Sequence, residues 1–213
     1  MERTWVSALI LGAGQARRMG LTKQLLPFGR TTLLGQVLGN VLASQVQETV
    51  LILGHEAGAI LRALGLNHPD PEEGLNRSDK IGFKVRINPE YAEGLSSSIR
   101  LGVSSLAPQA AAVMIVLGDQ PLIDPLVIDF LIATFRASGR GIVAPFYGGR
   151  RGHPILLHLK YRESMLGLRG DVGCREILST CSEDLLEVEV DCPGVVQDVD
   201  TLEEYRRCRE SLK

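Results

Sequence analysis

The sequence lacks a strong excess of charge of either sign, because 23 Lys and Arg residues stand against 25 Asp and Glu residues, for a net charge of -2. A surface that binds nucleic acid throughout needs a marked positive excess, so we expect no nucleic-acid partner. The charge is uneven, however: residues 1–162 carry 17 basic and 12 acidic side chains, and residues 163–213 carry 6 and 13. The positive excess in residues 1–162 favours an anionic ligand in that part of the chain, although solvated surface alone can produce the same uneven distribution of charge.

Long hydrophobic runs are also missing. The longest strongly apolar stretch covers residues 110–117, whereas a membrane-spanning helix needs about 18 residues. We therefore expect no membrane partner.

The four cysteines form no C-x-x-C pair, and all of them lie in the last 40 residues. This spacing argues against a zinc knuckle or a thioredoxin-type site. No secretory signal precedes the first predicted strand, so we expect reduced thiols and a cytoplasmic protein, which we take to be a monomer.

Short apolar runs alternate with longer amphipathic stretches along the chain, without an internal repeat or a low-complexity linker. Repeated strand–helix units predict one α/β domain over residues 1–213, with a Rossmann-like, open, mainly parallel sheet and helices on both faces. We expect strands at 5–11, 49–53, 83–88, 111–117, 141–145 and 185–190, helices at 31–44, 56–66, 96–106, 124–136 and 201–213, a polar surface loop at 67–80, a glycine-rich hairpin at 146–157 and mostly helical chain over 159–181.

A glycine-rich segment, L-G-A-G-Q-A-R-R-M-G, follows the first predicted strand. Its glycines allow backbone N–H groups to approach phosphate oxygens closely. It has Arg17 where a dinucleotide-binding motif needs its third glycine, and it lacks the Gly-Lys-Ser/Thr of a Walker loop. With Arg18 and Lys23 close by, a triphosphate cradle is favoured over a basic surface loop.

Two aspartate motifs follow predicted strands or precede a predicted helix. Asp119 in G-D-Q-P comes directly after a buried strand, where it predicts an Mg²⁺ ligand or, alternatively, a turn that caps the next helix. Asp198 and Asp200 face the same side of an extended segment. One of them can complete the metal site while the other caps the last helix with Thr201, although a plain helix start explains the same residues.

Three further blocks contain candidate ligand-binding residues. Asn88 ends a strand, and Gly94, Ser96 and Ser97 open a helix whose N–H groups and hydroxyls attract phosphate, although capping alone needs one serine.

In R-G-H-P, Arg151 and His153 are expected to bind or position an acceptor, with a structural turn as the alternative. In G-D-V-G-C-R, Asp171 and Arg175 suggest a second acceptor loop, because arginine matches the geometry of phosphate.

Taken in order, these blocks resemble the MobA-like nucleotidyltransferase family over residues 6 to about 205, and particularly its cytidylyl-transferring branch. The resemblance implies a Rossmann-like fold and direct transfer of CMP from CTP to the terminal phosphate of molybdopterin, with release of pyrophosphate. A nucleotide-binding front (1–120) and an acceptor-binding back (121–200) are expected, with a molybdenum hydroxylase as a client protein.

The same resemblance implies roles for individual residues. The backbone of Leu11, Gly12, Ala13 and Gly14 contacts the nucleobase and ribose, and Ala13 is typical of cytidylyl transfer, whereas Gly12 departs from the usual alanine. Arg18 and Lys23 bind the triphosphate, Asp119 holds Mg²⁺, and Asp198 or Asp200 is the second metal ligand.

Two alternatives remain from the sequence. One is a nucleotidyltransferase that uses another nucleotide and another phosphorylated acceptor, such as a sugar phosphate. The other is a non-catalytic carrier of the finished molybdenum cofactor, which binds it without turnover.

Overall fold

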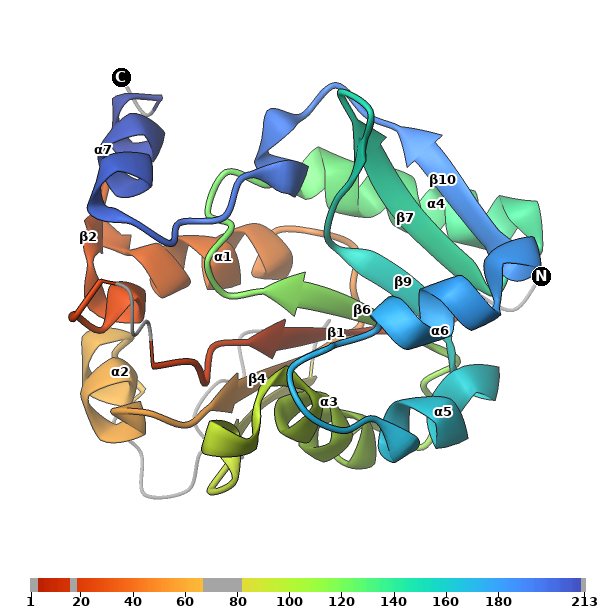
Figure 1. Ribbon diagram of the computed structural model, residues 1–213, viewed down its shortest axis with the longest axis horizontal. Coiled ribbons are helices and arrows are strands. Elements are labelled where there is room, and N and C mark those ends of the chain that lie inside the picture. The colour runs from red at the N-terminus through yellow and green to blue at the C-terminus, as the bar shows by residue number, and fades with distance from the viewer. Residues whose placement is uncertain (1–3, 16–18, 67–81, 212–213) are drawn as a thin grey trace.

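The computed structural model describes residues 4–15, 19–66 and 82–211. Arg17, Arg18 and the polar segment predicted at 67–80 lie outside these ranges. The described chain forms an eight-stranded sheet flanked by helices (Figure 1), together with a small two-stranded sheet.

The large sheet has the order β10-β7-β9-β6-β1-β4-β5, with β8 paired to β7. Neighbours are parallel except where β9 meets β6 and β7 and where β8 meets β7. The predicted open, mainly parallel sheet is therefore confirmed. The strands are β1 (Val6–Leu11), β4 (Glu48–Leu53), β5 (Gly82–Ile87), β6 (Ala112–Leu117), β7 (Ile142–Tyr147), β8 (Arg150–Arg151), β9 (Ile155–His158) and β10 (Leu185–Glu189), and the small sheet consists of β2 (Pro27–Phe28) and β3 (Thr31–Thr32).

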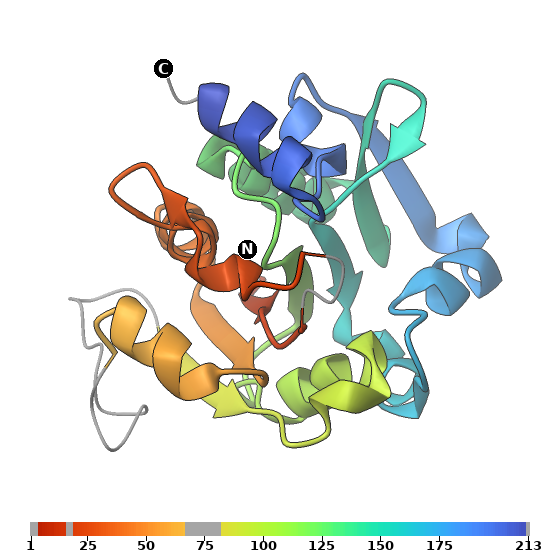
Figure 2. The same cartoon turned by 60° about the vertical axis from the view of Figure 1, so that its left-hand side comes forward.

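Helices cover both faces of the sheet, as Figures 1 and 2 show. They are α1 (Leu33–Leu42), α2 (Ala57–Ala63), α3 (Leu95–Ser104), α4 (Pro125–Ser138), α5 (Arg162–Gly167), α6 (Arg175–Thr180) and α7 (Leu202–Glu210). Helices α1, α2 and α4 contribute to one hydrophobic core, and α3, α5 and α6 contribute to the other. Helix α7 packs instead against β2 and the start of α1, through a small cluster that includes Phe28 and Tyr205.

Strand β1 shows why both faces are covered. Its six residues are all buried, with Ala8 and Ile10 in one core and Leu9 and Leu11 in the other. Side chains alternate between the faces of a sheet, so a strand that is buried throughout requires cover on both sides. None of the helices in the described ranges is long and apolar enough to cross a membrane.

The hairpin predicted at 146–157 is only partly correct. Strands β7 and β8 form it, pairing Phe146 with Arg151. The chain then leaves the hairpin, and β9 enters the sheet between β6 and β7. Ile155 and Leu157 are buried there beside β6, so the apolar residues of this segment fill a central position in the sheet.

The structure shows which residues cap the N-termini of helices α4 and α7. Asp124 caps α4 by accepting a hydrogen bond from the Leu126 N–H at 2.8 Å. Thr201 and Glu204 form a capping box at α7. The expected capping of that helix by Asp198 or Asp200 together with Thr201 is therefore corrected: the carboxylate partner is Glu204.

Two helical glycines provide a test of packing against the sheet. A Cβ on Gly102 in α3 would overlap the buried side chain of Leu9, whereas a Cβ on Gly39 in α1 would meet no atom within 4 Å. We expect Gly102→Ala to destabilise the protein by about 1–3 kcal/mol through overpacking, and Gly39→Ala to stabilise it by about 0.5–1 kcal/mol. Denaturant unfolding measures both, and a stable Gly102→Ala variant would contradict the close approach of α3 to β1.

Candidate active site

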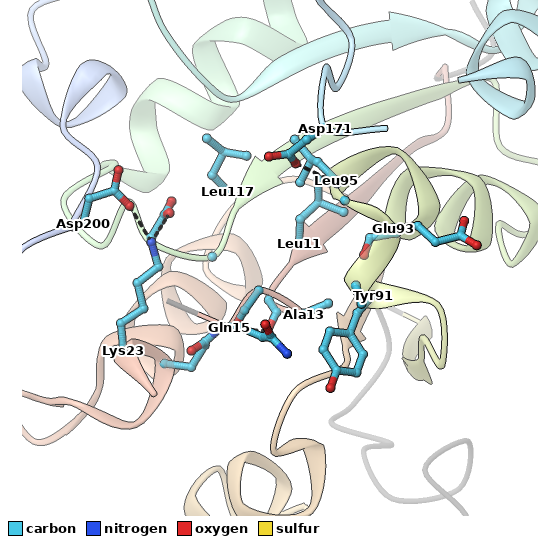
Figure 3. A pocket seen from close by; sticks show the side chains of 18 residues that line it. Leu11, Ala13, Gln15, Lys23, Tyr91, Glu93, Leu95, Leu117, Asp171 and Asp200 are labelled. Atoms are coloured by element: carbon cyan, nitrogen blue, oxygen red, sulfur yellow. Dashed lines mark hydrogen bonds and ion pairs between the residues drawn. The ribbon is translucent and has the colours of Figure 1, made fainter. Parts of the chain in front are cut away.

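The side chains of Lys23, Asp119 and Asp200 meet at the carboxyl end of the parallel strands. The Lys23 Nζ lies 2.7 Å from Asp119 Oδ2 and 2.9 Å from Asp200 Oδ1. Figure 3 shows the side chain of Lys23 pointing toward Asp200. The three residues come from separate parts of the chain: a short 3-10 turn at Lys23–Leu25, the loop after β6, and the segment before α7.

Backbone contacts hold these segments together. The Gly118 N–H donates to the Leu11 carbonyl at 3.0 Å, and the Val199 N–H donates to the Asp119 carbonyl at 3.0 Å. A Cβ on Gly118 would lie 2.7 Å from the Leu11 carbonyl oxygen, so glycine is required for this approach. Val199 is fully buried and places Asp198 and Asp200 on the opposite side of the extended segment.

The charges in this cluster influence one another strongly. Burial alone would lower the pKa of Lys23, but Asp119 and Asp200 outweigh that effect and hold the pKa above its ordinary value. Burial raises the pKa of Asp119, and the Lys23 ammonium opposes that rise. Because Asp198 and Asp200 also raise the pKa of Asp119, the cluster is an environment that favours an additional cation.

Gln24 binds the first part of the glycine-rich loop, at Gly12 and Gly14, beside this cluster. The Gln24 Nε2 donates to the carbonyls of Gly12 at 3.1 Å and Gly14 at 2.7 Å. Gln24 is buried, and these bonds orient the loop backbone while β1 anchors its beginning. The loop therefore presents a preorganised backbone to the space in front of it.

That space is a cavity of about 510 Å³, here called the loop cavity (Figure 3). Its wall is formed by the glycine-rich loop, the 91–95 segment, the residues around Asp119, and two residues from the second half of the chain. The lining residues are Leu11, Gly12, Ala13, Gly14, Gln15, Lys23, Gln24, Tyr91, Ala92, Glu93, Gly94, Leu95, Ser98, Leu117, Gly118, Asp119, Asp171 and Asp200.

A second cavity, of about 330 Å³, adjoins the first and is here called the arginine cavity. It shares Leu95, Leu117 and Asp171 with the loop cavity. Its other lining residues include Gln120, Arg150, Arg151, His153, Arg175 and Asp198. Each cavity is lined by residues from both expected regions, 1–120 and 121–200, so the expected boundary at residue 120 does not separate one cavity from the other.

His153 in the arginine cavity is uncharged near neutral pH. Burial lowers the pKa of its imidazole to about 4, with a smaller raising effect from Asp119 and a lowering effect from Arg175. Its backbone N–H donates to the Val195 carbonyl at 2.8 Å. A histidine with this pKa is a poor proton acceptor at neutral pH. Its expected role in binding or positioning an acceptor stays a prediction.

Several candidates expected to bind phosphate have other partners. Asn88 Nδ2 donates to the hydroxyls of Ser97 at 2.9 Å and Ser98 at 3.0 Å, and the Ser96 hydroxyl donates to the Arg169 carbonyl at 3.2 Å. Asn88, Ser96 and Ser97 are buried and do not line the loop cavity. The structure thus gives these three residues an internal packing role in place of the expected phosphate contact.

Two expected acceptor-binding residues also differ from expectation. Asp171 Oδ1 accepts from the Leu95 N–H at 2.9 Å and so caps α3 from across the chain. The Gly170 carbonyl accepts from the Ser96 N–H, so two N–H groups at the start of α3 already have partners. Arg151 Nε donates to Glu187 at 2.6 Å, which reduces its availability to an acceptor.

Sequence reasoning missed three residues of this region: Gln24, Gln120 and Arg150. Gln120 is buried and donates to Asp198 Oδ1 at 2.6 Å, and Arg150 lines the arginine cavity. Each stands directly beside a residue that was singled out, within K-Q, G-D-Q-P or R-R-G-H-P. Adjacency to a motif residue was the signal available for all three.

The residues around Asp119 fit a divalent cation held together with phosphate. Asp119 Oδ1 is buried and has no hydrogen-bond partner within the described residues. Mg²⁺ uses one or two carboxylates and completes its shell with water and phosphate oxygens. Among the described residues there is no group of three or more His, Cys, Asp and Glu side chains arranged to hold a metal ion.

The glycine loop and the lysine–aspartate cluster lie at the carboxyl edge of a mainly parallel α/β sheet, where open sheets of this kind bind nucleotides. Residues 8–188 match the model of the MobA-like NTP transferase domain. The chain belongs to this family, which confirms the resemblance seen in its motifs.

Curated relatives cover nearly the whole chain. The molybdenum cofactor cytidylyltransferase of Escherichia coli (strain K12) is 24% identical over 205 residues, covering 96% of both chains. The nicotine blue oxidoreductase of Paenarthrobacter nicotinovorans is 27% identical over 213 residues, covering 95% of both.

Solved structures are also similar to nearly the whole chain. Rv0371c from Mycobacterium tuberculosis H37Rv is 27% identical, with a TM-score of 0.79 over 98% of this chain and 99% of that one. A structure of Rv0371C in complex with manganese is 25% identical, with a TM-score of 0.74 over 97% of this chain and 98% of that one. Together these similarities support a nucleotidyltransferase of the MobA-like type.

The contacts of Gln24 predict a specific effect on nucleotide binding. We expect Gln24→Leu to weaken binding of the nucleotide about tenfold, because two hydrogen bonds that orient the loop are lost. Isothermal titration calorimetry with the variant measures this change. Gln36→Leu is the matched control, since the Gln36 amide bonds Asn40 within α1 and lies outside the loop cavity. Equal affinities of the two variants would contradict the role of Gln24.

Proposed function

We propose that this protein transfers CMP from CTP to the terminal phosphate of molybdopterin, with release of pyrophosphate and with Mg²⁺ as the metal. The observation that carries the proposal is the Lys23–Asp119–Asp200 cluster on the wall of the loop cavity, beside the adjoining arginine cavity. The similarity to a molybdenum cofactor cytidylyltransferase over nearly the whole chain supports the choice of acceptor.

The loop cavity is the proposed nucleotide site. The loop from Leu11 to Gly14 contacts the base and ribose, with Ala13 favouring cytosine through the resemblance to the cytidylyl branch. Lys23 binds the triphosphate. Arg18 is assigned the same role from its motif alone, because it lies outside the described residues.

The metal is assigned to Asp119 and Asp200, since both carboxylates converge on one point. Asp198 is the weaker candidate, because its carboxylate is exposed and accepts from Gln120 beside the arginine cavity. When bound, Mg²⁺ supplies positive charge that offsets the charge on the reacting phosphoryl oxygens. The manganese complex of a similar structure supports a divalent cation at this fold.

In the proposed reaction, an oxygen of the acceptor phosphate forms a bond to the α-phosphorus as the bond from that phosphorus to the leaving pyrophosphate breaks. The acceptor phosphate is already ionised at neutral pH, so the chain needs no base to activate it. Arg175, Arg150 and the neutral His153 line the space in which that phosphate is held. Lys23 remains on the nucleotide phosphates and stabilises their charge.

Pyrophosphate release tests this proposal. The purified protein is incubated with molybdopterin cofactor and Mg²⁺, and CTP, GTP and ATP are compared separately. We expect release with CTP in preference to the others. A preference for GTP would overturn the reading of Ala13, and cofactor binding without release would favour a carrier. Release that requires a sugar phosphate instead would replace the acceptor.

The metal assignment is tested by Asp119→Asn, which keeps the shape of the side chain but removes its charge. We expect turnover to fall by about 10²-fold or more, because a preorganised charge contact at the reacting phosphate is lost, while circular dichroism and thermal unfolding show an intact fold. Asp129→Asn is the control, since Asp129 bonds the exposed Gln45 far from the cavities. Near-normal turnover of Asp119→Asn at limiting Mg²⁺ would refute the assignment.

A further inference from the structure

The ammonium group of Lys23 occupies the point at which the two aspartates of the metal site converge. Its Nζ lies within hydrogen-bonding distance of Asp119 Oδ2 and Asp200 Oδ1, at 2.7 and 2.9 Å. Lys23 is itself buried, with 8% of its surface exposed, and the side chains of Asp119 and Asp200 are half-buried. The position assigned to the metal therefore already contains a cation of the chain.

An ammonium and a divalent metal ion cannot share this position. Mg²⁺ binds carboxylate oxygens at about 2.0–2.1 Å. An ion held by both oxygens that face Lys23 would overlap the Nζ atom and repel its charge. Access of a metal ion to the two oxygens that face Lys23, Asp119 Oδ2 and Asp200 Oδ1, thus requires the ammonium to move.

The loop cavity offers the ammonium a second location. Lys23 lines that cavity, in which the nucleotide and its phosphates are expected to bind. Its flexible four-carbon stem allows the ammonium to move while the backbone of the 3-10 turn stays in place. Phosphate oxygens are the groups in the proposed reaction that can replace the carboxylates as partners of Lys23.

We propose that Lys23 is a resident counter-ion that blocks the Asp119–Asp200 metal site until nucleotide phosphates draw it away, so that metal and nucleotide bind cooperatively. This inference rests on the proposed function for the location of the metal and the phosphates. It assigns Lys23 a second role, because the residue expected to bind the triphosphate also controls access to the metal site.

Cooperativity of this kind is reciprocal. If the nucleotide strengthens metal binding by some factor, the metal strengthens nucleotide binding by the same factor. The structure thus predicts weak binding of the metal alone to the wild-type protein.

Mn²⁺ binding measured by electron paramagnetic resonance tests the inference without any turnover. We expect Lys23→Met to bind Mn²⁺ in the absence of nucleotide at least about tenfold more tightly than the wild type, a factor typical of coupled sites. CTP alone, with no acceptor present, should strengthen Mn²⁺ binding by the wild type and have a much smaller effect on the variant. Lys23→Arg keeps a cation at this position and should keep the weak binding.

Two further variants locate the effect. Lys160→Met removes another aspartate-paired ammonium, that of Lys160 and Asp184, so it measures the general effect of losing one positive charge. It should leave Mn²⁺ affinity near the wild-type value. In the double variant Lys23→Met with Asp119→Asn, the gain in affinity should disappear.

Equal Mn²⁺ affinities of the wild type and Lys23→Met without nucleotide would overturn the inference. An equal gain in Lys160→Met would do the same, because the effect would then be one of net charge. These outcomes depend neither on the acceptor nor on the nucleobase. If Lys23→Met tightened Mn²⁺ binding but the pyrophosphate assay failed, the proposed function would be refuted and the inference about Lys23 would stand.

Discussion

The contact of Lys23 with Asp119 and Asp200 is the interaction on which the arrangement of the site depends. It joins residues separated by 96 and 177 positions in the sequence. Two half-buried carboxylates that lie close together repel each other, and partial burial makes their charged forms still less favourable. A cation between them removes this penalty, so the segments around β1, β6 and α7 can meet at one edge of the sheet.

Two features of the backbone bring these segments together. The parallel pairing of β1 with β6 ends both strands at the same edge, with Leu11 beside Leu117. Gly118 then permits a close approach that a side chain would prevent, and the buried Val199 fixes the segment that carries Asp200. The charged cluster is therefore positioned by apolar packing and by the absence of one Cβ.

The fold was largely predictable from the sequence, because few folds are compatible with a regular alternation of apolar strands and amphipathic helices. The insertion of β9 was not, since its four residues have the same local pattern in a hairpin as in the centre of a sheet. The misassigned residues share a similar cause. Asp171 caps α3 from 76 residues away, and the Ser96 hydroxyl bonds the Arg169 carbonyl 73 residues away, so each contact depends on the tertiary arrangement rather than on nearby sequence. Lys23 and Asp119 were singled out because the motifs around them are local.

The resident cation also explains how a site for a highly charged ligand persists in the free protein. With Lys23 in place, the site is neutralised in part by a group that the ligand can displace. When phosphates draw the ammonium toward the glycine loop, they expose the carboxylates at the moment when phosphate oxygens are available to complete a metal shell. The lysine that offsets the charge of the two carboxylates in the free protein is then the same group that links occupation of the metal site to the presence of nucleotide.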